Sequence, residues 1–126
     1  MPGTTQPLTD LRTRLLALHK MLLDDQRRTY EATYGRVASG GELLRLVLQH
    51  EDFTWLRALS AIISRIDETL EETEHPVSDT DVTTFVDEIR ALLRSGGTSF
   101  FDTKYRDALQ RSPEIVMAHA AVMKLL

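Results

Sequence analysis

Three polar residues at helical spacing are the first candidates for chemistry in this sequence of 126 residues. His19, Gln26 and Tyr30 share one heptad seam with Leu16 and Leu23. Polar groups on such a seam can point between helices, where some line a small-ligand cavity or fix the register of a dimer. The interpretation we favour places them at the edge of an apolar stripe, bonded to water or to a backbone carbonyl.

His119 is a fourth candidate, because it lies among the apolar residues Ile115, Val116, Val122 and Met123 near the end of the chain. A lone histidine on an apolar face is more often a satisfied core residue than a catalyst. General acid–base chemistry would also require a partner, and the sequence identifies none. His119 therefore joins the other three as a candidate ligand-binding residue, and no residue is assigned a catalytic role.

A metal site is indicated only weakly. Helix bundles that hold two metal ions use paired motifs in which a histidine follows a glutamate by three positions. Glu72 and His75 match this spacing once, beside Pro76, in a polar segment. Because the second half of the pattern is missing, we interpret the segment as a solvated acidic helix end and expect neither a metal nor a cofactor.

Trp55 and Arg57 are candidate interface residues, since tryptophan and arginine are favoured anchors of protein contacts. A single tryptophan at helical spacing is more often a core residue, so this is the interpretation we favour for Trp55. The run from Asp24 to Arg28 places opposite charges three and four positions apart, which is typical of a self-neutralising, solvated face.

Several function classes are excluded or disfavoured by composition. The sequence contains no cysteine, which rules out disulfides, thiolate catalysis and cysteine-bound metal clusters. It also lacks a glycine-flanked serine elbow and a phosphate-binding loop, so we expect no enzyme. A formal charge of -4 and a sparse basic face after Asp52 disfavour nucleic-acid binding. No apolar run approaches the roughly 20 residues of a membrane span.

The elements that would position these residues are predicted to be helices. A long first helix begins after Thr9, or at the earlier proline, and runs to Tyr34. Its apolar stripe alternates spacings of three and four and comprises Leu8, Leu11, Leu15, Leu18 and Leu22. Ser39 and Glu42 have the spacing of a capping box at the start of a short second helix.

Asp52 is expected to cap a third helix, whose buried face runs from Trp55 to Leu70. Ser78 begins a fourth helix, with acidic residues in its first turn and Gly96-Gly97 at its end. Two short helices follow.

The first of these short helices falls within residues 98–110, and Ser112-Pro113 begins the second as cap and first helical residue. The sequence thus predicts an all-α protein, a bundle of five to six helices with a long first helix and a short C-terminal helix pair. Residues 1–7 are expected to form a flexible arm and residues 8–126 a single domain.

For function, elimination favours a non-catalytic interaction or regulatory module, cytoplasmic and acting through a protein partner or as a homodimer. A first helix longer than its neighbours would leave part of its stripe for a second subunit. The alternative is a small-ligand or metal-binding bundle that uses His19, Gln26, Tyr30 and His119.

Overall fold

Helices account for all the regular structure that the computed structural model describes, which covers residues 2–94 and 97–126. Their bounds are α1 Pro2–Tyr34, α2 Gly40–Gln49, α3 Glu51–Thr54, α4 Arg57–Glu71, α5 Asp79–Leu93, α6 Phe100–Arg111 and α7 Pro113–Met123. The predicted all-α class, the long first helix and the short C-terminal pair are confirmed. The described part of the chain has seven helices rather than five or six, because the single turn α3 precedes α4 as a separate element.

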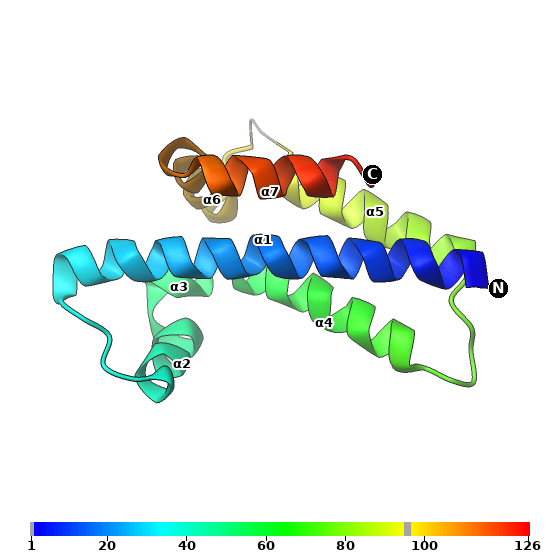
Figure 1. The fold of residues 1–126 in the computed structure, drawn as a ribbon, viewed down its shortest axis with the longest axis horizontal. Coiled ribbons are helices and arrows are strands. Elements are labelled where there is room, and N and C mark those ends of the chain that lie inside the picture. Colours follow the sequence, from blue (N-terminus) through cyan, green and yellow to red (C-terminus); the bar gives the residue numbers. More distant parts are fainter. Residues whose placement is uncertain (1, 95–96) are drawn as a thin grey trace.

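The longest helix, α1, organises the fold. Its 33 residues correspond to about 50 Å, and it runs the length of the molecule. In Figure 1, α2, α3 and α4 lie below α1 and α5, α6 and α7 above it, while α4 and α5 also contact each other. α1 packs most extensively against α7 and α4. The predicted leucine stripe, Leu8, Leu11, Leu15, Leu18 and Leu22, is buried along its whole length. Each of these side chains contributes about 1.5–3 kcal/mol before entropy is deducted.

Because the stripe is covered within one chain, it leaves no apolar segment for a second subunit, contrary to our expectation from the length of α1. An interface between two copies would have to use other side chains. None of the helices in the described residues is both long enough and apolar enough to cross a membrane.

α1 begins at Pro2, upstream of both expected starts, after Thr9 and at the proline boundary of Pro7. Thr9 is an interior helical residue whose hydroxyl donates to the carbonyl oxygen of Thr5, one turn earlier, rather than capping the helix. Leu8 is fully buried, so the helix must already be formed at that point to place it in the core. Pro7 lies inside α1. The flexibility expected for residues 1–7 stays a prediction.

Three of the predicted helix starts are confirmed by their hydrogen bonds. The hydroxyls of Ser39, Ser78 and Ser112 accept from the backbone N–H groups three positions later. At Ser78 the return bond from the serine N–H to Asp81 completes a capping box. The box predicted at Ser39 is displaced by one residue on its second side, because Glu42 accepts from the N–H of Ala38.

The prediction that Asp52 caps the third predicted helix is wrong. Asp52 lies in the first turn of α3, and its N–H donates to Nδ1 of His50, which is the residue that caps α3. α4 starts after a tight turn at Trp55 and Leu56, without a side-chain cap. This turn is held instead by burial of Phe53, Trp55 and Leu56 in the core.

α5 ends at Leu93, with Arg94 in an extended conformation, and thus earlier than the expected stop at Gly96-Gly97. Gly96 lies outside the described residues. Gly97 serves a different purpose, because a side chain there would collide with the carboxylate of Asp102. That carboxylate accepts from the N–H of Ser99, whose hydroxyl accepts from the N–H of Asp102. Gly97 therefore leaves room for a capping box that starts α6.

Candidate functional site

His19 is one of the predicted site residues, and it links α1 to α4. Its Nε2 lies 2.7 Å from the hydroxyl of Ser60, which also lies 3.1 Å from the carbonyl oxygen of Leu56. Since a carbonyl only accepts, the serine proton is directed to Leu56 and Nε2 of His19 donates to Ser60. A nucleophilic serine would need the opposite direction, with histidine accepting its proton. Burial lowers the pKa of His19, which favours the neutral ring, and the pair therefore acts as an interhelical link.

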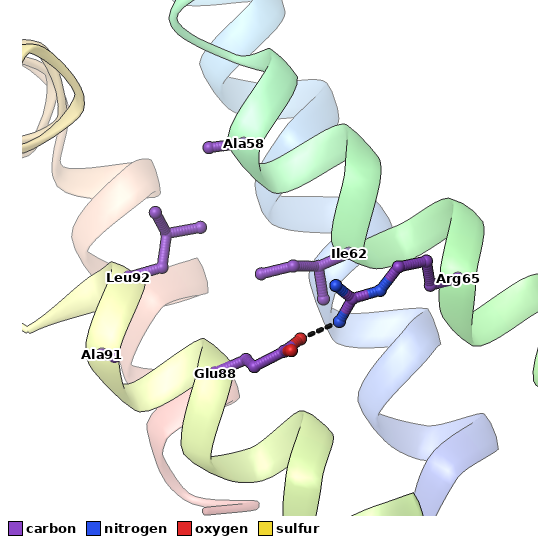
Figure 2. Close-up of a pocket in the computed structure, with 6 residues that line it drawn as sticks. All are labelled: Ala58, Ile62, Arg65, Glu88, Ala91 and Leu92. Carbon is purple, nitrogen blue, oxygen red and sulfur yellow. Dashed lines mark hydrogen bonds and ion pairs between the residues drawn. The ribbon is translucent and has the colours of Figure 1, made fainter.

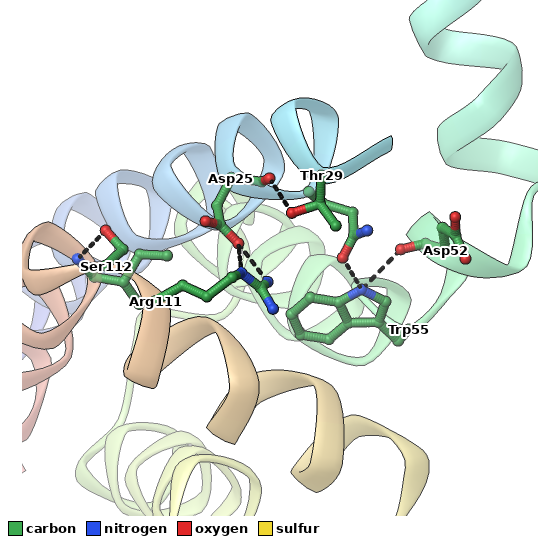
Figure 3. Close-up of polar contacts among 8 residues, drawn as sticks. Asp25, Thr29, Asp52, Trp55, Arg111 and Ser112 are labelled. Carbon is green, nitrogen blue, oxygen red and sulfur yellow. Dashed lines mark hydrogen bonds and ion pairs between the residues drawn. The ribbon is translucent and has the colours of Figure 1, made fainter. Parts of the chain in front are cut away.

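Gln26 and Trp55 form a second link between α1 and its neighbours. The indole Nε1 of Trp55 donates to Oε1 of Gln26 at 3.2 Å and to the carbonyl oxygen of Asp52 at 2.9 Å. Gln26 and Trp55 are both buried, which confirms the core interpretation of Trp55. Figure 3 shows the indole ring between α1 and Asp52, so its single donor is shared by two elements.

Asp25, next to Gln26, points to a different part of the fold. Its Oδ2 accepts from Nη2 of Arg111 at 2.6 Å and from Nε of the same side chain at 3.2 Å (Figure 3). Asp25 is buried, so the expectation that the whole run from Asp24 to Arg28 is solvated is wrong at this position. The spacing of charges in the sequence suggests only partners for Asp25 on its own helix. Its actual partner, Arg111, is the last residue of α6. Asp25 and Arg111 therefore tie the α6–α7 corner to α1.

His119, on α7, forms a hydrogen bond to a residue of α6. Its Nδ1 lies 2.7 Å from the hydroxyl of Tyr105. Burial lowers the pKa of His119 and raises that of Tyr105, which favours the neutral form of both groups, and one hydrogen bond joins the hydroxyl to the ring nitrogen. The ring of Tyr105 stacks on Phe101, which in turn packs against Trp55. His119 is thus part of the packing between α6 and α7.

Tyr30 belongs to an aromatic cluster at the end of α1, made of Tyr30, Tyr34, His50 and Phe53. The centroid of the Tyr30 ring lies 4.8 Å from Tyr34, 5.3 Å from His50 and 5.7 Å from Phe53. At these separations the rings pack against one another rather than around an enclosed ligand. The cluster fastens the C-terminal end of α1 to the start of α3.

The structure therefore places the four predicted ligand-binding residues in four separate contacts, and it does not bring them together around one cavity. His19 bonds to Ser60, Gln26 to Trp55 and His119 to Tyr105, while Tyr30 packs in the aromatic cluster. Arg57, the second candidate interface residue, is exposed, and its guanidinium donates to the carbonyl oxygen of Leu48 near the end of α2.

The weak metal motif lies on the exposed segment between α4 and α5. Side-chain oxygens of Glu72 and Glu74 and a ring nitrogen of His75 lie within 4.8 Å of one another. Glu72 also accepts from the N–H of Glu74 at 2.8 Å, a local bond that holds the segment in this shape. Exposed acidic groups commonly cluster without a metal, so the grouping does not by itself make a site.

Grooves and exposed apolar side chains are the remaining surface features. One groove, of about 410 Å³, lies between α4 and α5, where the ion pair of Arg65 and Glu88 crosses above Ile62 (Figure 2). A second, of about 400 Å³, lies between α1 and α7. Large apolar side chains are exposed on α2 and α7. From the sequence we predicted neither helix to be a surface: His119 and its apolar neighbours on α7 were interpreted as core, and no burial was predicted for the apolar residues of α2.

Comparison with known proteins gives no relative from which a function could be transferred. No family model, no curated protein and no solved structure matches this chain.

Proposed function

We propose that this chain is a non-catalytic helical module that acts through protein contacts, with α2 as the element that a partner binds. One observation carries the proposal. α2 is strongly amphipathic, yet it contains no buried residue. Leu44 and Leu48 are 59% and 54% exposed. They are four positions apart and share one side of the helix, where they form an apolar ridge that the rest of the described chain does not cover.

The position of α2 supports this role. It packs mainly against α3, and it stands away from α1 at one end of the molecule (Figure 1). Its other apolar residues, Leu43, Leu46 and Val47, are half-buried. A short amphipathic helix with an exposed leucine ridge is suited to a hydrophobic groove on another protein. We therefore propose that the partner offers such a groove.

The interior contacts support a non-catalytic role. His19 and His119 are held neutral by burial, and each is bonded to a hydroxyl that belongs to the packing between helices. The alternative of a small-ligand or metal-binding bundle would require His19, Gln26, Tyr30 and His119 to converge, and their separate contacts do not favour it. We expect no cofactor, and we propose a cytoplasmic location and self-association as a homodimer as parts of the same hypothesis.

Photocrosslinking in the producing cell tests the role of α2. A photoreactive amino acid at Leu48 should give one discrete adduct, and Leu44→Asp in the same chain should reduce that adduct several-fold by placing a charge on the ridge. The same photoreactive residue at Glu71, an exposed position at the end of α4, is the matched control and should not give the adduct.

Leu44→Asp should change the free energy of unfolding by less than about 0.5 kcal/mol, because Leu44 is exposed. Loss of the adduct would then report binding rather than unfolding. An adduct that is absent from the Leu48 sample, or one that persists unchanged with Leu44→Asp, would contradict the proposal.

A further inference from the structure

We propose that the groove between α1 and α7 is the surface through which two copies of this chain associate. This inference rests on the self-association part of the proposed function and names its surface, which is separate from the α2 ridge. The groove is lined by Arg14, Ala17 and Met21 from α1 and by Glu114, Met117, Ala118 and Ala121 from α7.

α7 is apolar on more sides than its own fold requires. Ile115, Ala118 and Val122 face the core and are buried. Val116 and Met117, on other sides of the same helix, are 46% and 73% exposed. A helix that is hydrophobic all round is normally covered all round. In this fold α1 and α6 cover only part of α7.

The groove combines a hollow and a projection on one surface. Ala17, Ala118 and Ala121 have small side chains, which leave the hollow between the two helices. Met117 lines the same groove and is largely exposed, and its unbranched side chain adapts readily to an irregular apolar surface. A surface that carries both features is suited to a second copy of itself, in which each Met117 enters the hollow of the other chain.

Charge complementarity identifies the occupant as a second copy. α1 and α7 run in opposite directions along the groove (Figure 1). Glu114, in the first turn of α7, lies beside Asp24 and Arg28, whereas Arg14 lines the groove more than two helical turns earlier on α1. Arg14 and Glu114 are the charged residues that line the groove itself, one toward each end. The adjoining hollow around Glu114 is of mixed charge, with Asp24, Arg27, Arg28 and Glu31. Neither Arg14 nor Glu114 has a hydrogen bond or an ion pair within residues 2–94 and 97–126.

In the proposed dimer, a twofold axis relates the two copies and crosses the groove between Arg14 and Glu114. It places each end of the groove in one copy against the opposite end of the groove in the other copy. Arg14 of each copy then faces Glu114 of the other, so that two opposite-charge pairs flank the central methionines. The same residues are used on both chains, as a closed dimer requires.

Charge reversal tests this arrangement, with sedimentation velocity and native mass spectrometry as readouts. The unmodified chain should show a concentration-dependent dimer. Arg14→Glu and Glu114→Arg should each weaken that dimer by roughly tenfold or more, since each places like charges opposite each other twice. Mixing the two variants should restore a dimer of near-normal affinity that contains one chain of each, because both pairs are again of opposite charge. Met117→Asp should abolish the dimer.

Phe100→Asp is the matched control, because it adds the same charge to another exposed apolar residue, at the start of α6 and outside both proposed surfaces, and should leave the dimer intact. Thermal unfolding followed by circular dichroism should show that every variant remains folded. An unmodified chain that stays single at high micromolar concentration would overturn both self-association and this surface. A dimer that is insensitive to Met117→Asp, or variants that fail to pair with each other, would overturn the surface while leaving self-association in place. Neither result would affect the crosslinking test of α2.

Discussion

Arg111 and Asp25 are 86 residues apart in the sequence, yet Nη2 of Arg111 lies 2.6 Å from Oδ2 of Asp25. Arg111 is the last residue of α6, and the following residue, Ser112, caps α7. The pair thus fixes the corner between the two C-terminal helices on the C-terminal part of α1. Because α7 forms one wall of the proposed dimer groove, this contact also holds that wall in position.

Asp25→Asn should lower the free energy of unfolding by about 1–2 kcal/mol, because it removes a charge-assisted hydrogen bond from a buried carboxylate. This value is at the low end for a hydrogen bond between charged groups, because the side chain of Arg111 is 40% exposed and partly solvated. Urea unfolding measures the change. Glu88→Gln, in the exposed pair with Arg65, is the control and should have an effect below about 0.5 kcal/mol. Equal effects of the two substitutions would contradict a special role for Asp25.

Trp55→Phe should lower the free energy of unfolding more than Gln26→Leu does. Trp55→Phe removes the N–H that donates to both Gln26 and Asp52, so the buried amide oxygen of Gln26 loses this donor. It also reduces the volume of the core. Together these effects should lower the free energy of unfolding by about 2–4 kcal/mol. Gln26→Leu leaves the indole bonded to Asp52 and should have an effect below about 1 kcal/mol. Far-ultraviolet circular dichroism in urea compares the two, and the reverse order would show that Gln26 is the dominant member of the link.

Stability should decrease as the pH is lowered below about 6.5, the ordinary pKa of histidine. Burial lowers the pKa of His19 and His119 in the folded state, so the unfolded chain binds protons first and gains stability as the pH falls. Above the unfolded pKa both states are neutral and the effect is absent. Urea unfolding at pH 7.5 and pH 5.5 measures the difference. His119→Gln should reduce it, whereas His75→Gln, at an exposed position, should not. A difference unchanged by His119→Gln would count against this explanation.

Gly97→Ala should destabilise the protein by about 0.5–2 kcal/mol, the usual range for loss of a helix cap. The added methyl group would displace the carboxylate of Asp102 and break its bond to the N–H of Ser99. Gly40→Ala is the control, because a side chain there meets nothing within 4 Å, and it should be neutral. Thermal unfolding distinguishes the two variants, and the prediction fails if Gly97→Ala melts with the unmodified protein.

Helix patterns and caps could be read from the sequence because they depend on near neighbours. The α1 stripe follows from its spacing of three and four, and Ser39, Ser78 and Ser112 each bond within one turn. The start of α1 was misplaced because Thr9 has the side chain of a capping residue, while burial of Leu8 extends the helix upstream.

Contacts between distant elements could not be predicted in the same way. The run from Asp24 to Arg28 suggests local ion pairs, and nothing in its spacing distinguishes the buried Asp25 from the exposed Asp24. His19 and Gln26 each bond a side chain on another element, so the interpretation we favoured, an edge position bonded to water or to a backbone carbonyl, is wrong for both. Their partners, Ser60 and Trp55, depend on how α4 and the α3–α4 turn pack on α1, which periodicity does not specify.

Native mass spectrometry of the unmodified chain distinguishes a self-associating module from a ligand-binding bundle, because one spectrum reports the number of subunits and any retained metal or small molecule. A non-catalytic, self-associating module should give masses of one and two unmodified chains, with the two-chain species increasing with concentration. A bound metal or small molecule retained after gentle purification would contradict it in favour of a ligand-binding bundle, and a strictly one-chain spectrum at high micromolar concentration would contradict self-association.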